Sequence, residues 1–176
     1  MIMNLEVIKK QFILDQIWIL TVQASFQRAN VYKWHNNKEA RKLALRAQIE
    51  EIAKQYVNPV SEKAHIQNIW GICCTDDVGL NINFGVAQKL LNLYLKYLWT
   101  LGIINLAPPH FPVDRMIQEA LKYKQLFNWT GLVCECNYKY LIEYAKAEMN
   151  ERKLNRLAEM ELMVYNEWVN KTKLPK

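Results

Sequence analysis

Apolar residues recur with helical spacing from residue 84 to residue 101, in the stretch FGVAQKLLNLYLKYLWTL. This spacing follows the i, i+4, i+7, i+8 pattern of an α-helix, and a second apolar stripe runs beside the first. The two stripes are Val86, Leu90, Leu93, Tyr94, Tyr97, Leu98 and Leu101, and Leu91, Leu95 and Trp99. A helix that is apolar around most of its circumference is buried inside a protein. The sequence therefore predicts a central, buried helix over residues 84–101.

A narrow polar stripe completes the circumference of this predicted helix. It consists of Gln88, Lys89, Asn92, Lys96 and Thr100. Amide and ammonium groups are costly to bury without partners. We therefore expect this stripe to face water, a cleft or a ligand.

Six further stretches have helical periodicity or helix-start signals. They are residues 5–23, 38–57, 61–74, 115–127, 138–153 and 156–169. The residues Asn4, Asn36 or Asn37, Ser61 and Asn137 stand at the starts of four of them, and asparagine and serine favour helix N-caps. The sequence thus predicts an all-α fold of about seven helices, with a frayed tail over residues 170–176.

The length of 176 residues favours one all-helical domain over residues 1–176. One arrangement of these helices has two lobes with a cleft between them. In that arrangement the N-terminal helix and the helices within residues 137–170 form the minor lobe.

Composition and charge narrow the classes of function. Hydrophobic residues make up 51% of the chain and charged residues 23%, as in ordinary globular proteins. The net charge of +6 permits attraction to phosphates. No uncharged apolar run approaches the roughly 20 residues of a membrane span. Glu6, Lys9 and Lys10 interrupt the segment that a signal peptide would need. We therefore expect a cytoplasmic protein without membrane contact.

The cysteines do not have the spacing of a metal site. They are Cys73, Cys74, Cys134 and Cys136. Paired zinc ligands are usually separated by two to four residues, which neither pair matches. We expect four reduced, mostly buried thiols, and neither a metal nor a cofactor.

Two short motifs are the strongest signals of function. The first is GVAQK at residues 85–89, and the second is PVDR at residues 112–115. In this order, and separated by a helix, they resemble the motifs of the helix-hairpin-helix DNA glycosylase superfamily over about residues 84–115. The resemblance implies a helical, two-lobed fold that cleaves an N-glycosidic bond in DNA.

The resemblance also implies roles for individual residues. Lys89 matches the lysine that attacks the sugar C1′, and Asp114 matches the essential aspartate. Gly85 and Val86 match a hairpin that binds DNA phosphates through backbone amides. This chemistry is physically reasonable, because a carboxylate stabilises positive charge on the sugar and a lysine amine can form a Schiff base.

A base that leaves the DNA stack would need further contacts. Gln88 and Asn92 offer hydrogen bonds to its edge, and Trp34, Trp99 or Trp129 offers a ring to stack on. Alternatively, Trp34 anchors the loop at residues 24–37 on the core.

Phosphate contacts would come from basic residues around the cleft. We place Lys96 in the cleft, and His110 and Arg115 at its mouth. The helix at residues 38–57 would add four cations if it faces the same side: Lys38, Arg41, Lys42 and Arg46.

The same residues also have purely structural interpretations. Asp114 follows Pro-Val at a helix start, where aspartate favours the N-cap. Lys89 and Lys96 can extend from a buried helix to reach water. Arg115 can pair with Glu119 one helical turn later.

A second hypothesis is therefore a non-catalytic helical module for protein interaction or sensing. In that case another protein chain, or a second copy of this one, covers the polar stripe. An apolar patch of Met160, Met163 and Trp168 would then mark the binding surface.

Overall fold

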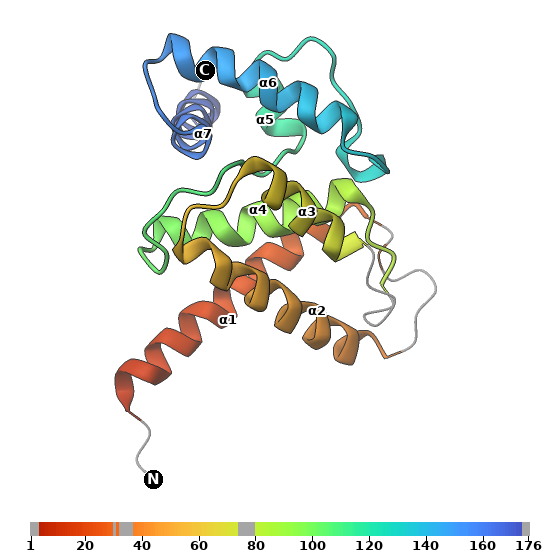
Figure 1. Cartoon of the computed structure of the whole chain (residues 1–176), viewed down its shortest axis with the longest axis vertical. Helices are drawn as coiled ribbons and strands as arrows, with labels where there is room; N and C mark the ends of the chain where they lie inside the picture. Colours follow the sequence, from red (N-terminus) through yellow and green to blue (C-terminus); the bar gives the residue numbers. More distant parts are fainter. Residues whose placement is uncertain (1–3, 30, 32–36, 74–79, 174–176) are drawn as a thin grey trace.

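The computed structural model describes residues 4–29, 31, 37–73 and 80–173 (Figure 1). These residues form seven α-helices and two short 3-10 helices, and no strand. The α-helices are α1 (Leu5–Phe26), α2 (Lys38–Ala53), α3 (Glu62–Cys73), α4 (Phe84–Thr100), α5 (Arg115–Ala120), α6 (Cys136–Glu151) and α7 (Leu157–Lys173). The 3-10 helices are η1 (Lys54–Val57) and η2 (Trp129–Gly131). The all-α prediction is confirmed.

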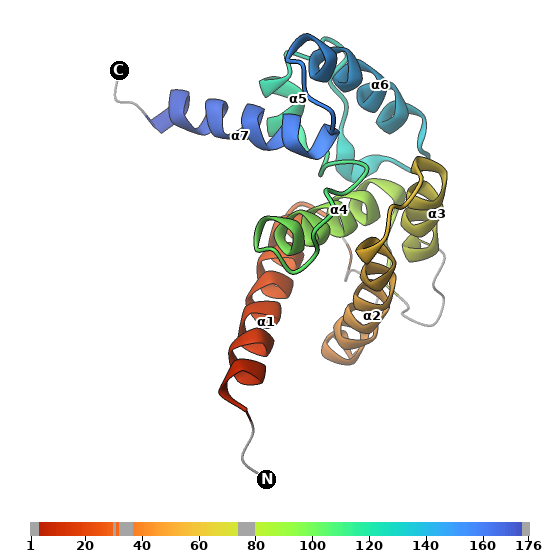
Figure 2. The same cartoon turned by 60° about the vertical axis from the view of Figure 1, so that its left-hand side comes forward.

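Helix α4 lies at the centre of the fold. Helices α1 and α3 pack against it, and α2 packs against α3. Helices α5, α6 and α7 lie on the other side of α4 (Figures 1 and 2). Helix α1 thus lies on the same side of α4 as α2 and α3 (Figures 1 and 2).

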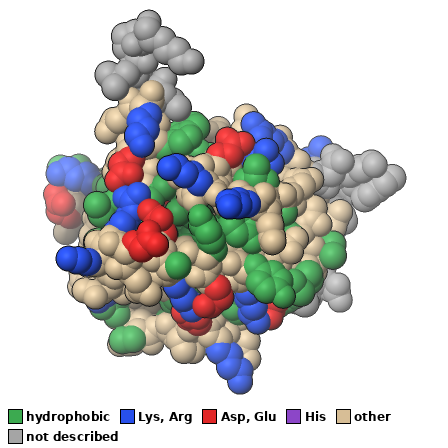
Figure 3. Space-filling view, turned by 90° about the horizontal axis from the view of Figure 1, so that it is seen from above, with side chains coloured by type: hydrophobic (Ala, Val, Ile, Leu, Met, Phe, Trp, Pro, Cys, Tyr) green, Lys and Arg blue, Asp and Glu red, His purple; other side chains and the backbone are tan. Residues whose placement is uncertain are grey.

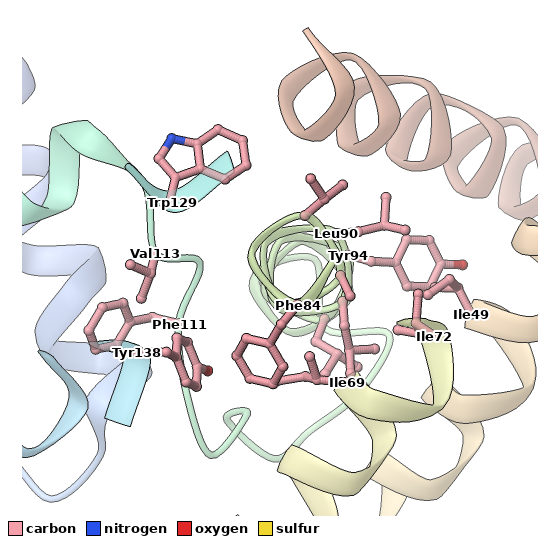
Figure 4. Close-up of a cluster of buried hydrophobic side chains, with 14 of the residues drawn as sticks. Ile49, Ile69, Ile72, Phe84, Leu90, Tyr94, Phe111, Val113, Trp129 and Tyr138 are labelled. Atoms are coloured by element: carbon pink, nitrogen blue, oxygen red, sulfur yellow. The ribbon is translucent and has the colours of Figure 1, made fainter. Parts of the chain in front are cut away.

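The core forms on both sides of α4 because its side chains point toward both groups of helices. Every residue from Phe84 to Asn92 is buried. Isoleucines from α2 and α3 surround Tyr94 on one side, and Phe111, Val113, Trp129 and Tyr138 lie on the other (Figure 4). Each large apolar side chain that is fully buried contributes about 1.5–3 kcal/mol.

Gly85 lies where the backbone of η2 passes closest to α4. A Cβ added at Gly85 would lie 1.7 Å from the carbonyl oxygen of Trp129. The Gly85 amide also donates to the Leu132 carbonyl at 3.1 Å. Only glycine permits this approach of two backbones, so the residue has a structural reason to be here.

Helix α5 ends seven residues before the end of the predicted helix at residues 115–127. Lys122 has a positive φ of 55°. The Tyr123 amide donates to the Gln118 carbonyl at 2.9 Å, which closes the helix in a Schellman-like turn. The prediction was wrong because glycine is the usual sign of such a turn, and here a lysine adopts the conformation.

Other helix ends agree only partly with the predicted ones. Asn4 and Ser61 accept hydrogen bonds from backbone amides, as predicted for helix N-caps. Asn37 makes no side-chain cap, Asn36 lies outside the described residues, and α6 has already begun before Asn137. Helix α7 continues through most of the predicted frayed tail.

Not all apolar residues are turned inward. Leu43 of α2 and Tyr140 of α6 are exposed. The N-terminal half of helix α1, which projects from the body, has more exposed apolar side chains than its C-terminal half (Figure 2). Among the helices described, none combines the length and the apolar character needed to cross a bilayer.

Replacing Gly85 with alanine should destabilise the protein by about 3 kcal/mol, because the backbone of η2 must move away from α4. The control is Gly71→Ala in α3, where an added Cβ has nothing within 4 Å. That change should stabilise the protein by roughly 0.5–1 kcal/mol. Urea unfolding measures both. Equal stability of Gly85→Ala and the wild type would contradict the close approach.

Candidate functional site

The polar stripe of α4 divides between two environments. Lys89, Lys96 and Thr100 line a cleft between α4 and α7. Gln88 and Asn92 are fully buried and turned into the core. The expectation that the stripe faces a cleft is thus confirmed for the first three residues and wrong for the two amides.

Lys89 and Asp114 form an ion pair in the lining of this cleft. Lys89 Nζ lies 3.0 Å from Asp114 Oδ2, and the two side chains are only 10% and 21% exposed. The ammonium group also lies 4.4 Å from the ring centre of Trp129, a cation–π contact. The other carboxylate oxygen, Oδ1, accepts the Ile117 amide at 3.1 Å. Asp114 is therefore an N-cap, as its structural interpretation predicted, and it still has one oxygen for Lys89.

Gln88 determines where Asp114 lies. Its Oε1 accepts the Val113 amide at 3.0 Å, and its Nε2 donates to the carbonyls of Val113 at 2.7 Å and Gly85 at 3.0 Å. These partners satisfy a buried amide that would otherwise be costly. Because Val113 directly precedes Asp114, the hydrogen bonds hold the carboxylate beside Lys89. The prediction that Gln88 reads a base edge is thus corrected, and the residue has a positioning role.

Lys96 repeats the arrangement two turns further along α4. Its Nζ donates to both carboxylate oxygens of Glu161, at 2.8 and 2.6 Å, and lies 4.7 Å from the ring centre of Tyr165. The Glu161 side chain is only 3% exposed. Each lysine therefore has a carboxylate and an aromatic ring, and the two lysines are about 10 Å apart along the helix.

Two hollows flank the pair formed by Lys89 and Asp114, and both residues line each hollow. The larger has a volume of about 480 Å³ and lies between α4 and α7, and the smaller has about 220 Å³. Arg28 and Trp129 line the smaller one. The larger hollow has mostly apolar and aromatic walls: Leu93, Tyr97, Pro112, Met116, Leu162 and Tyr165.

The buried carboxyl of Glu161 differs electrostatically from an ordinary surface glutamate. Burial raises the pKa of Glu161, the neighbouring Lys96 lowers it, and the charge of Asp114 raises it again. The net direction is upward. The cleft therefore contains a carboxyl group that takes up a proton more readily than an exposed glutamate does.

Charge around the cleft is mixed rather than uniformly basic. Arg115 pairs with Glu119 at 2.6 Å, as its structural interpretation predicted. On the face seen from above, basic and acidic side chains are intermixed, with apolar side chains between them (Figure 3). None of the basic residues expected to supply phosphate contacts from α2 lines either hollow: Lys38, Arg41, Lys42 and Arg46.

The backbone amides expected to bind phosphate are engaged within the chain. The Gly85 amide donates to Leu132, and the Val86 amide donates to Asn83 Oδ1 at 3.0 Å. Both residues are buried. Their predicted phosphate contact is therefore corrected, because the amides instead hold η2 and the start of α4. Trp34 lies outside the described residues.

His110 was predicted to lie at the mouth of this cleft. It lies instead in a second buried polar cluster. Its ring centre is 4.9 Å from that of His65, which has no other histidine near it in the sequence. Tyr138 binds both His110 and Asn92, so Asn92 also belongs to this cluster rather than to a base-binding surface. An adjacent groove of about 730 Å³ is lined by His110 together with Glu62, Lys63, Trp70, Glu135, Lys139 and Glu143.

Hydrogen bonds connect asparagine, tyrosine and histidine side chains in this cluster. Asn92 Nδ2 donates to the Tyr138 hydroxyl at 3.0 Å, and the hydroxyl lies 2.9 Å from His110 Nδ1. The Tyr138 hydroxyl thus joins the Asn92 amide to the His110 ring in one hydrogen-bonded chain. The same hydrogen-bonded arrangement of asparagine, tyrosine and histidine occurs a second time, in Asn68, Tyr56 and His65.

Burial keeps both histidines neutral. It lowers the pKa of His65 well below the usual value, and a positive charge on His110 would lower it further. It lowers the pKa of His110 to about 3, with Lys146 as the second cause. This cluster is a packed polar network within the core.

The cysteines are more exposed than predicted. Cys134 and Cys136 are exposed, and Cys73 is half-buried. Cys74 lies outside the described residues. Within the part of the chain that the structure describes, no three histidine, cysteine or carboxylate side chains gather as a metal site.

Sequence reasoning missed Glu161, although the sequence contains a signal for it. Leu157, Met160 and Val164 are buried at i, i+3 and i+7 on α7, and Glu161 at i+4 shares their face. A charged residue on an apolar stripe requires a buried partner. The lysine at position 96 of α4 is that partner. Nothing comparable in the sequence indicates that Tyr165 lies over its ammonium group.

Replacing Lys96 with methionine should cost about 3–5 kcal/mol near pH 8, because it leaves the Glu161 carboxylate buried without its partner. Burial raises the pKa of Glu161, so protonation should reduce the cost as the pH falls toward about 5. Urea unfolding at both pH values measures this. The control Lys96→Met/Glu161→Leu should regain most of the loss. A loss below about 1 kcal/mol in the single variant would indicate a weak, solvated pair instead.

Acid should destabilise the protein through the two buried histidines. Their folded pKa values lie below the unfolded value of about 6.5, so the unfolded chain binds more protons as the pH falls. Stability is therefore complete above about pH 6.5 and is lost as the pH falls toward the folded values. Each histidine should lower the folding equilibrium constant by up to about tenfold per pH unit.

The variant His110→Gln tests this prediction by comparison with the wild type. It should lose the contribution of one histidine to the pH dependence, whereas the exposed carboxyl groups titrate alike in both proteins. Urea unfolding between pH 7.5 and pH 5 measures the slope. Identical slopes would contradict a neutral, buried His110.

We found no protein-family model that matches this chain, and no significant match among the curated proteins or the solved structures compared with it. Its function must therefore be inferred from the geometry and chemistry of the cleft.

Proposed function

We propose that this protein is a DNA-repair-like N-glycosylase, or a divergent relative that binds nucleic acid or a nucleotide, and that it acts in the cytoplasm. Its site in this proposal is the cleft at Lys89 and Asp114. The observation that carries the proposal is the distance of 3.0 Å between Lys89 Nζ and Asp114 Oδ2. An amine and a carboxylate at hydrogen-bond distance have the geometry of a nucleophile and its base.

The proposed reaction begins with transfer of a proton from Lys89 to Asp114. The neutral amine attacks C1′ of the sugar, the N-glycosidic bond breaks, and the base leaves with the bonding electrons and takes up a proton. The leaving base takes its proton from Asp114, whose carboxylate then accepts one proton from the attached amine and passes it to the ring oxygen. The C1′–O4′ bond breaks, and the amine nitrogen forms a protonated Schiff base with C1′. If water is the nucleophile instead, the Asp114 carboxylate stabilises the positive charge that builds on the sugar.

The larger hollow supports the proposal as a place for an extruded base. Its volume of about 480 Å³ falls within the range of small-molecule pockets, roughly 300–1,000 Å³. Tyr97 and Tyr165 provide rings along its wall, and Glu161 provides a hydrogen-bonding group beside them. In the smaller hollow, Trp129 and Arg28 are suited to stacking and to a phosphate contact.

Base release from labelled duplexes carrying uracil, oxidised guanine or alkylated bases tests the proposal, with alkali to cleave abasic sites. Asp114→Asn should lower nucleobase release by roughly 100-fold or more, because it removes the carboxylate that accepts the proton of Lys89. Asparagine is as good an N-cap as aspartate, so α5 should remain intact. The matched control is Asp15→Asn on α1, which should leave release unchanged. No release from any duplex, or release that Asp114→Asn does not alter, would overturn the proposal.

A non-catalytic interaction or sensing module is the second candidate function, and the exposed apolar residues of α1 favour it. The patch predicted for such a module is not formed, because Met160 is fully buried and Trp168 is half-buried, with only Met163 exposed. Salt separates the two candidates. DNA binding through phosphates weakens steeply as salt is added, whereas an apolar protein contact does not.

A further inference from the structure

Helix α1 has apolar side chains on two opposite faces. The inner face includes Ile17 and Trp18, which are buried, and the helix packs against α4. The outer face is exposed along most of the helix. Its apolar residues are Leu5, Ile8, Phe12 and Ile19. Single exposed apolar residues are ordinary, but a continuous stripe of them marks a contact surface.

The outer stripe is straight and accessible. Leu5, Phe12 and Ile19 recur every seven residues, so they stay on one side of the helix over about 21 Å. Ile8 lies between the first two. The first half of α1 extends away from the other labelled helices in both views (Figures 1 and 2). A straight helical partner can therefore lie along the stripe.

Three residues of the stripe, Leu5, Phe12 and Ile19, match their own reverse. Leu5 and Ile19 are each seven residues from Phe12, in opposite directions. An antiparallel second copy would place Phe12 against its own counterpart and Leu5 against Ile19 of the second copy. A self-complementary patch of this kind is what a two-fold dimer requires.

The area is sufficient for such a dimer. With the exposed residues Ile13 and Leu20 beside it, the stripe presents roughly 600 Å² of apolar surface per copy. Two copies together present about 1,200 Å², above the roughly 1,000 Å² in total that a specific interface should clear. Lys9 and Gln16, exposed beside it, would form a polar rim.

We propose that two copies of this chain form an antiparallel dimer through the outer face of α1, with Phe12 at the two-fold axis. The four residues of the stripe line neither hollow beside Asp114, so the dimer is independent of the proposed chemistry.

Sedimentation of the full chain tests the proposal first. The wild type should have twice the mass of the 20.9 kDa chain, and Phe12→Glu should have the mass of one chain with unchanged helical circular dichroism. The control is Val133→Glu before α6, which is 75% exposed, comparable to the 62% of Phe12, and should leave the dimer intact. A monomeric wild type, or a Phe12→Glu variant that stays dimeric, would overturn the proposal.

Engineered disulfides test the antiparallel register. Under oxidation Phe12→Cys should link to its counterpart, and peptide mapping should identify the linkage because Cys134 and Cys136 are also exposed. Leu5→Cys should not link to itself, because the two copies of this position would lie about 21 Å apart along the helices. Linkage between the two residues at position 5 would show a parallel pair and overturn the register.

Discussion

The hydrogen bonds from the Gln88 side chain to the Val113 backbone join the two halves of this molecule. Helices α1 and α3 pack on one side of α4, and the chain then returns along the other side toward α5. Gln88 binds both the amide and the carbonyl of Val113, as a neighbouring strand would. With this segment fixed, Asp114 lies beside Lys89 and begins α5 at the same point. The site depends on one buried amide.

The cleft contains ion pairs whose removal from water costs free energy. A buried ion pair is rarely more stable than well-packed apolar residues of the same volume. This chain nevertheless has two such pairs side by side, at Lys89 and at Lys96, and each lysine also contacts an aromatic ring. Among these groups Glu161, whose pKa is raised by burial, is a candidate for function rather than for stability. The histidine cluster differs, because its two rings are neutral, bonded to tyrosines and enclosed by the core.

The sequence predicts the helices better than their side-chain partners. Apolar periodicity alone identifies α4 as the central helix, because a helix apolar on most sides has no stable position at the surface. It also places Lys89 and Lys96 on one stripe. Apolar periodicity does not predict the path of the chain after α4. That path brings Val113 to Gln88 and His110 to His65. Those contacts join residues far apart in sequence, and no local pattern encodes them.

Local rules also failed where the sequence around one residue fits two alternative roles. Gly85 fits a hairpin that binds phosphate, but it also fits a position where two backbones touch, and only the tertiary contact with Trp129 distinguishes them. Asp114 is different, because its N-cap role and its contact with Lys89 are compatible and both are present. Finding a structural role for a residue therefore does not by itself exclude a chemical one.

Reductive trapping with borohydride tests the central claim about the cleft most directly. The protein would be mixed with lesion-bearing DNA and borohydride, and any covalent adduct located by peptide mapping. The proposed lysine chemistry predicts an adduct on Lys89 that is absent from Lys89→Met and present in Lys96→Arg. An adduct on another lysine, or none on DNA from which the protein releases the base, would contradict the role of Lys89 as the nucleophile.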